Sequence, residues 1–101
     1  MKFLVIALPG TNPLPREQAV NLLTAGLSWI KTKIEDGTVE CHYSLFGGGG
    51  MGIVNAASHE AMLEILLAYP LYPFFTWEVK PLLDYEAAYK QYASFYQQIS
   101  G

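Results

Sequence analysis

The sequence predicts a single α+β domain in which the elements follow the order strand, helix, strand, strand, helix, strand and helix. Three observations lead to this prediction. The spacing of apolar residues alternates between stretches typical of strands and stretches typical of helices. Segments rich in proline and glycine separate these stretches. The chain has 101 residues, which is the length of one domain, so residues 1–101 are assigned to one unit.

The first half of the chain contains two predicted strands and one helix. Residues 2–8, KFLVIAL, are apolar at successive positions, which is typical of a central strand covered on both faces. From Arg16, directly after Pro15, apolar residues recur at three- and four-residue steps and predict a long helix that ends near Gly37. Residues 38–46 alternate and predict a strand with two chemically different faces. One face carries Val39, Cys41, Tyr43 and Leu45, and the other carries Thr38, Glu40, His42 and Ser44.

The second half supplies two more strands and two more helices. Residues 51–57 predict a short strand, and the helix after it begins at a Ser58 cap and ends before Pro70. Residues 74–79 are rich in aromatic and β-branched side chains and predict a strand that Pro81 terminates. A C-terminal helix follows an Asp84 cap. The order of the first six elements is the split βαβ, or ferredoxin-like, pattern.

The composition predicts self-association. The chain is 51% hydrophobic and only 15% charged, and 14% of its residues are aromatic, so a domain of this size has difficulty burying its apolar surface alone. We therefore expect a homo-oligomer. The last helix carries tyrosines at helical spacing, which suit a surface shared with a neighbouring subunit. They are Tyr85, Tyr89, Tyr92 and Tyr96.

Charge and cysteine content exclude several classes of function. The net charge is −3 and the six basic residues are scattered, so no basic stripe for nucleic acid is present. No apolar stretch is long enough to cross a bilayer. Cys41 is the only cysteine, and the two histidines lack clustered partners, so neither a disulfide within the chain nor a metal site is predicted. We expect a cytoplasmic protein that works without a cofactor.

Residues 47–52 read GGGGMG and match the G-x-G-x-x-G spacing of dinucleotide-binding turns. A strand is predicted directly after these glycines, whereas a dinucleotide site needs a helix there, so the nucleotide interpretation is rejected. A hairpin turn or bulge is the leading interpretation. The alternative is a pocket wall in which the glycine backbone passes close to a ligand. In that case Gly48, Gly49 and Gly50 bind the substrate.

Two residues are candidates for proton transfer. His42 is a candidate general base, since imidazole titrates near neutral pH, and Glu40 and Ser44 on its strand face are candidate substrate contacts. Glu78 is the second candidate, because burial among aromatic residues would raise the pKa of its carboxyl. The competing interpretations are a surface position for His42 and an exposed or Lys80-paired carboxylate for Glu78. The neighbouring tryptophan, Trp77, is assigned to the core or to the pocket wall.

Residues 66–82, LLAYPLYPFFTWEVKPL, resemble the corresponding segment of muconolactone δ-isomerases, where a helix ends in L-P-L-F/Y-P and an aromatic strand ending in E-V follows. Residues 36–38, DGT, and 58–62, SHEAM, are also similar to that family. The resemblance implies a ferredoxin-like fold whose sheets pair into a dimeric α+β barrel, with larger rings built from such dimers. It also implies cofactor-free migration of a double bond in a small unsaturated lactone, by proton abstraction and return.

The chain departs from this family where the family's catalytic residues lie. The stretch that matches the helical glutamate is residues 25–28, AGLS, and the glycines at 47–50 replace a G-H-Y segment. Two hypotheses therefore stay open, namely an isomerase-like enzyme that acts on a small, mostly apolar ring compound and a non-catalytic ligand-binding or structural oligomer. A cofactor-independent monooxygenase of the same barrel class is a third. The sequence leaves open which face of the second strand lines the barrel.

Overall fold

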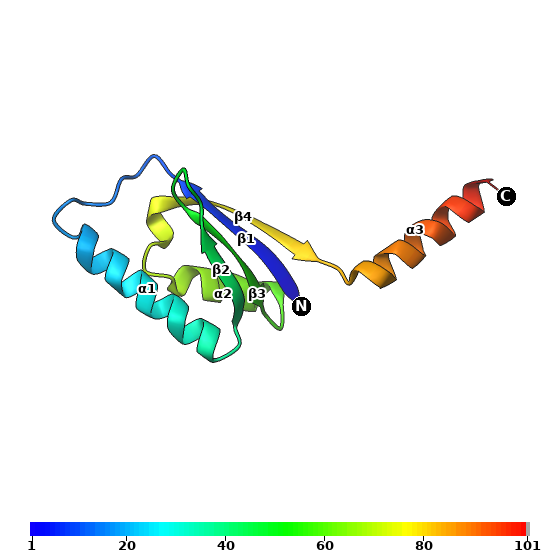
Figure 1. Ribbon diagram of the computed structural model, residues 1–101, viewed down its shortest axis with the longest axis horizontal. Coiled ribbons are helices and arrows are strands. Elements are labelled where there is room, and N and C mark those ends of the chain that lie inside the picture. The colour runs from blue at the N-terminus through cyan, green and yellow to red at the C-terminus, as the bar shows by residue number, and fades with distance from the viewer. Residues whose placement is uncertain (101) are drawn as a thin grey trace.

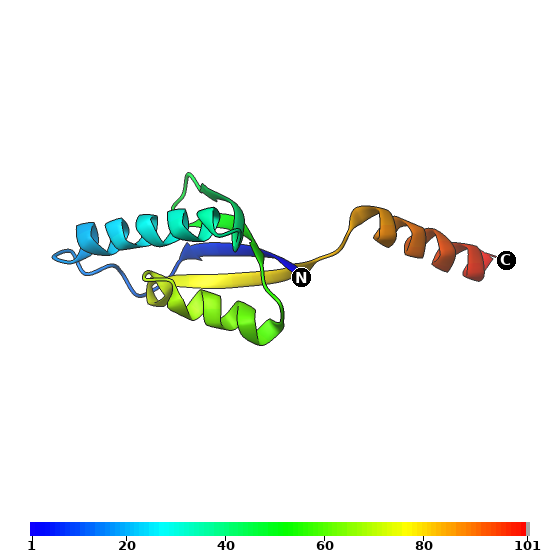
Figure 2. The ribbon, with the colours of Figure 1, turned by 90° about the horizontal axis from the view of Figure 1, so that it is seen from below.

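The computed structural model describes residues 1–100 and has the predicted ferredoxin-like order (Figure 1). The strands form one antiparallel sheet in the order β2-β3-β1-β4. Helices α1 and α2 lie side by side across one face of this sheet (Figure 2). The elements are β1 (Lys2–Pro9), α1 (Ala19–Glu35), β2 (Val39–Ser44), β3 (Gly50–Asn55), α2 (His59–Ala68), a 3-10 turn (Tyr72–Phe74), β4 (Phe75–Leu82) and α3 (Tyr85–Ser100).

Local capping interactions fix where the later helices begin, as the sequence predicts. The backbone N–H of Ala61 donates to Ser58 Oγ at 3.0 Å, so Ser58 is the N-cap of α2. The backbone N–H of Ala87 donates to Asp84 Oδ2 at 3.0 Å before α3. Helix α2 ends at Ala68, two residues before Pro70, since proline disfavours helical backbone in the residue before it.

Two predicted boundaries are wrong by three residues, and the other boundaries differ by two residues or fewer. Helix α1 begins at Ala19 rather than at Arg16, because residues 15–18 form a turn in which the Gln18 N–H donates to the Pro15 carbonyl at 3.0 Å. Strand β4 continues through Pro81 to Leu82. Proline is tolerated there because β4 is an edge strand that pairs only with β1.

The core lies between the sheet and the two helices. Alternate residues of β1 point into it and are buried, namely Phe3, Val5 and Ala7. Phe3 and Val5 pack with Val39 of β2, Val54 of β3, Ala56 directly after β3, and Met62 of α2. This buried row therefore identifies the face of the sheet that the helices cover. The site described below lies in the same layer, between the sheet and the helices.

The opposite face of the sheet has no helix over it. The β1 residues Leu4 and Ile6 point to this open face and lie opposite Ile53 and Met51 of β3. All four side chains are partly accessible in the single chain. The central strands thus give the uncovered face an apolar centre, which is the arrangement that pairing of two sheets would complete.

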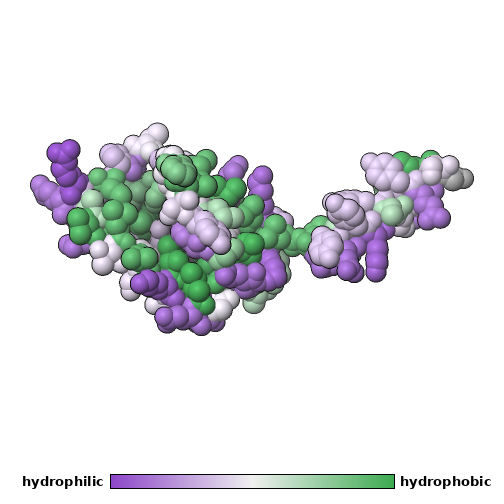
Figure 3. Space-filling model, viewed as in Figure 1, coloured by the Kyte–Doolittle hydropathy of each residue, from purple (hydrophilic) through white to green (hydrophobic). Residues whose placement is uncertain are grey.

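Helix α3 projects away from the domain, and the chain measures 64 Å along its longest axis (Figures 1 and 3). Two residues, Leu83 and Asp84, separate it from β4. Its large apolar side chains are all more than half exposed, and they are Tyr85, Tyr89, Tyr92, Phe95, Tyr96 and Ile99. Among residues 1–100, no helix has both the length and the apolar character needed to cross a membrane.

Candidate active site between the sheet and the helices

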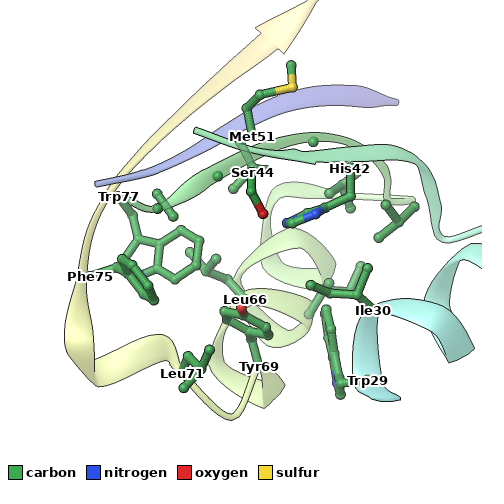
Figure 4. A pocket seen from close by; sticks show the side chains of 18 of the residues that line it. Trp29, Ile30, His42, Ser44, Met51, Leu66, Tyr69, Leu71, Phe75 and Trp77 are labelled. Atoms are coloured by element: carbon green, nitrogen blue, oxygen red, sulfur yellow. The ribbon is translucent and has the colours of Figure 1, made fainter. Parts of the chain in front are cut away.

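A cavity of about 340 Å³ lies between the covered face of the sheet and helices α1 and α2 (Figure 4). A volume of this size falls in the range of small-molecule sites. Most of the wall is aliphatic or aromatic, and the sheet side includes glycine backbone. The main contributors are Leu27 and Ile30 from α1, Ile65 and Leu66 from α2, Tyr69 and Leu71 from the segment after it, and Phe75 and Trp77 from β4.

A bulge in β2 decides which of its side chains face the cavity. Val39 pairs with Val54, but the next pair is Cys41 with Ile53, so Glu40 is the extra residue. The extra residue shifts the alternation by one position. His42 consequently joins Val39 on the covered face, beside Gly52.

The predicted division of this strand into two faces is therefore wrong in part. Val39 does not share a face with Cys41 and Tyr43, and Glu40 does not share one with His42 and Ser44. Both His42 and Ser44 line the cavity, and their polar atoms point to the same part of it (Figure 4). A strict two-residue period could not locate a bulge, since the sequence has no local signal for one at Glu40.

Two glycines of β3 give the His42 ring its space. A Cβ built on Gly50 would lie 3.3 Å from both Cε1 and Nε2 of His42, and 2.9 Å from the Tyr43 carbonyl oxygen. A Cβ on Gly52 would lie 3.5 Å from His42 Cδ2 and 2.9 Å from the Cys41 carbonyl oxygen. A side chain at position 50 would press on the imidazole, and one at either position would press on the backbone of the neighbouring strand. The backbone of these glycines thus lies directly beside the imidazole, with no side chain in between.

The preceding glycines form the turn between β2 and β3. Gly48 and Gly49 have φ values of +99° and +81°, in the left-handed region that favours glycine. The Gly48 N–H donates to the Leu45 carbonyl and the Leu45 N–H donates to the Gly49 carbonyl, both at 3.0 Å. The run therefore contributes both to the turn and to the cavity wall, and Gly49 belongs to both. Gly49 and Gly50 line the cavity, whereas Gly48 lies beside Pro9 and does not.

Burial controls the protonation of the two titratable groups in the wall. Burial lowers the pKa of His42, because the low-polarity surroundings disfavour the imidazolium. Burial also raises the pKa of the Tyr69 phenol. At neutral pH the site therefore presents a neutral imidazole, which can accept a proton, and a neutral phenol, which can donate a hydrogen bond.

Sequence reasoning did not identify Tyr69 as a residue of the site. The ring lies 5.3 Å from that of Trp29 and 5.8 Å from that of Trp77, between centroids. The Trp77 indole N–H donates to the Tyr72 carbonyl at 3.0 Å, which fixes the tryptophan in the wall. The position of Trp77 in the cavity wall agrees with the prediction. The tyrosine directly before Pro70 was the available signal, since the chain turns there and redirects the ring.

The two carboxylates predicted for the site lie elsewhere. Glu78 pairs with Ile6 on the open face of the sheet, one residue after Trp77, which faces the cavity. Glu40, the extra residue of the bulge, forms an exposed ion pair with Lys2. The structure therefore does not bring Glu78 or Glu40 together with His42. Within residues 1–100, no group of three potential metal-ligating side chains occurs.

No protein-family model matches the sequence, and no match is found among curated proteins. Solved structures do match. A muconolactone isomerase superposes with a TM-score of 0.73 at 21% identity, over 83% of this chain and 90% of that one. A 5-chloro-2-hydroxyhydroquinone dehydrochlorinase from Burkholderia phenoliruptrix, complexed with 2,5-dihydroxybenzoquinone, has a TM-score of 0.67 at 14% identity, over 82% and 94%. At these identities the likeness establishes the fold, so this chain has the fold of muconolactone isomerase.

Proposed function

We propose that the cavity is the site of a cofactor-free proton transfer on a small, mostly apolar ring compound, with His42 as the base. The observation that carries this proposal is the placement of His42. The bulge at Glu40 turns its imidazole into a mostly apolar cavity, where burial keeps the ring neutral and able to accept a proton.

The proposed chemistry is a migration of a double bond. His42 takes a proton from a ring carbon next to a carbonyl group, and the electrons of that C–H bond form an enolate. The protonated His42, which exchanges its proton with solvent, then delivers a proton to the far carbon of the conjugated system, so the double bond moves and no electron is gained or lost. The fold shared with muconolactone isomerase supports this reaction type.

Elimination of chloride from a ring is a second candidate, supported by the fold shared with the dehydrochlorinase. Such a reaction would also begin with proton removal by His42, after which the electron pair would form a double bond as chloride leaves. The two candidates differ in the substrate and not in the base. A chlorinated ring compound that releases chloride in the presence of the protein would favour the second.

Exchange of substrate hydrogen with solvent tests the role of His42. In heavy water, the protein should introduce deuterium next to the carbonyl of an unsaturated γ-lactone, as followed by NMR. Replacing the base by His42→Gln should slow this exchange by about 100-fold or more, the usual share of a general base. Glu78→Gln, on the other face of the sheet, should change it less than twofold. Exchange that continues unchanged in His42→Gln would contradict the role of His42 as the base, and no exchange with the unaltered protein would favour a non-catalytic binding module.

We also propose that the chain works as a homo-oligomer. The open face of the sheet, with Leu4, Ile6, Met51 and Ile53, and the exposed aromatic side of α3 both support self-association. Light scattering on the purified chain should give an even multiple of 11.2 kDa. A monomer at micromolar concentration would contradict this.

A further inference from the structure

We propose that the cavity takes a flat, uncharged ring and excludes compounds that carry a carboxylate. This inference rests on the proposed function, since it names the substrate class of the same site. It is carried by the charge of the wall and by the arrangement of the aromatic rings within it.

The polar side chains of the wall are all neutral groups. Among the described residues that line the cavity, hydrogen-bonding side chains come from His42, Ser44, Tyr69 and the two tryptophans, and none is a lysine or arginine. A carboxylate moved from water into such a wall loses its hydration and finds no cation in exchange. Lys33 lies near one lining residue, with Nζ 5.7 Å from the centre of the Trp29 ring. Its ammonium already has a partner, because Nζ lies 3.9 Å from Asp36 Oδ2.

The shape of the wall favours a planar ligand. The rings of Trp29, Tyr69 and Trp77 follow one another on the side formed by the helices and β4. On the sheet side, the backbone of Gly50 and Gly52 lies beside His42 and adds no side-chain bulk at those two positions. Aromatic walls contact a ring face or edge with good geometry. The volume of about 340 Å³ is about twice that of the ~150 Å³ cavity that holds benzene, so it suits one substituted ring.

The neutral polar groups fit the edges of such a ring. His42 and Ser44 lie on the sheet wall, and Tyr69 lies on the opposite, helical wall (Figure 4). A ring with a carbonyl or hydroxyl group at one edge and an acidic hydrogen at the other could interact with the polar groups of both walls. Cyclic ketones, lactones, quinones and phenols share this chemistry, and none of them needs a cation for binding.

A matched pair of ligands tests the exclusion of charge. Two unsaturated γ-lactones with the same ring, one with a methyl and one with a carboxymethyl substituent, are titrated into the full-length protein at pH 7.5 by calorimetry. A second pair is hydroquinone and 2,5-dihydroxybenzoate. In each pair the neutral compound should bind at least 10-fold more tightly than the anion.

A cation introduced at the wall should weaken this preference. Leu27 lines the cavity and is 57% exposed, so Leu27→Arg places a guanidinium at the wall without burying it. Affinity for the carboxymethyl lactone should rise about 10-fold, while affinity for the methyl lactone should stay within threefold. Val20→Arg is the control, since Val20 is 75% exposed on the same helix and does not line the cavity.

The outcomes separate this inference from the proposed function. Equal binding of the neutral and anionic members, with His42-dependent exchange retained, would overturn the exclusion of charge and leave the proton transfer standing. Tighter binding of the anions would do the same and would point to a cation that enters the site from elsewhere. If no member of either pair binds and no exchange occurs, both proposals fail.

Discussion

The two faces of the sheet differ more than their composition suggests. The covered face carries buried Phe3, Val5 and Ala7 together with the cavity, whereas the open face carries apolar residues mixed with exposed charges. Trp77 and Glu78 are neighbours in β4, yet one lies in the cavity wall and the other is exposed on the opposite side. Chemistry in this fold is therefore decided by the face to which a residue belongs, and one bulge suffices to move a histidine from one face to the other.

The largest effect on this comparison is expected at the hairpin that joins β2 to β3. A Cβ on Gly49 would lie 1.9 Å from the Ala7 carbonyl oxygen, and its φ of +81° is strained for any other residue. Gly49→Ala should therefore lower the free energy of unfolding by about 4 kcal/mol, measured by urea denaturation. Gly47→Ala is the matched control, because a Cβ there meets no atom within 4 Å.

A loss below about 1 kcal/mol for Gly49→Ala would contradict this prediction. It would mean that β3 can move away from β1 at little cost. The covered face would then not be a rigid surface, since the glycine backbone beneath His42 would no longer be held in place by β1.

Neighbouring substitutions in β4 should separate the two faces in a single strand. Trp77→Ala removes a side chain that contacts Tyr69, Tyr72 and Phe75, and should cost about 3 kcal/mol of unfolding free energy. Glu78→Ala removes an exposed carboxylate and should change stability by less than about 0.5 kcal/mol in the isolated domain. Thermal and urea unfolding of the two variants measure the difference. Comparable losses in both would indicate that the open face is covered in solution.

The smallest expected effect is a pH dependence that belongs to the covered face. Burial lowers the pKa of His42 in the folded chain, while in the unfolded chain it returns to about 6.5. The unfolded state then binds the proton more readily, so stability falls as the pH drops from about 6.5 through the lower folded value, and this term is flat above pH 6.5. His42→Gln should remove this slope, and His59→Gln should leave it in place. An unchanged slope in His42→Gln would show that the imidazole is solvated.

The order of the elements could be predicted because each helix and strand has its own period and local caps. Ser58 and Asp84 cap their helices through bonds between residues close in the chain, and such bonds leave a trace in the sequence. The alternation of β2 gave the wrong faces, because the bulge at Glu40 depends on pairing with β3. The continuation of β4 through Pro81 was missed for a related reason. Whether a strand lies at an edge is a property of the whole sheet.

The candidate site could be predicted only in part. His42, Ser44 and Trp77 were identified, and all three line the cavity. Glu78 lies on the opposite face of the sheet from them, and the choice between two faces of a strand cannot be made without the helices that cover one. Tyr69 was missed because its role arises where a helix ends and the chain turns.

The intrinsic fluorescence of the aromatic wall also reports on the cavity. The chain has two tryptophans, and both Trp29 and Trp77 line the cavity, with the Tyr69 ring between them. Excitation at a wavelength that only indole absorbs would not excite the tyrosines of α3. The emission would then come from the cavity wall alone. A ligand that quenches or shifts this emission would be detected as it binds. Binding of ring compounds can thus be screened by fluorescence, without a label or a coupled assay.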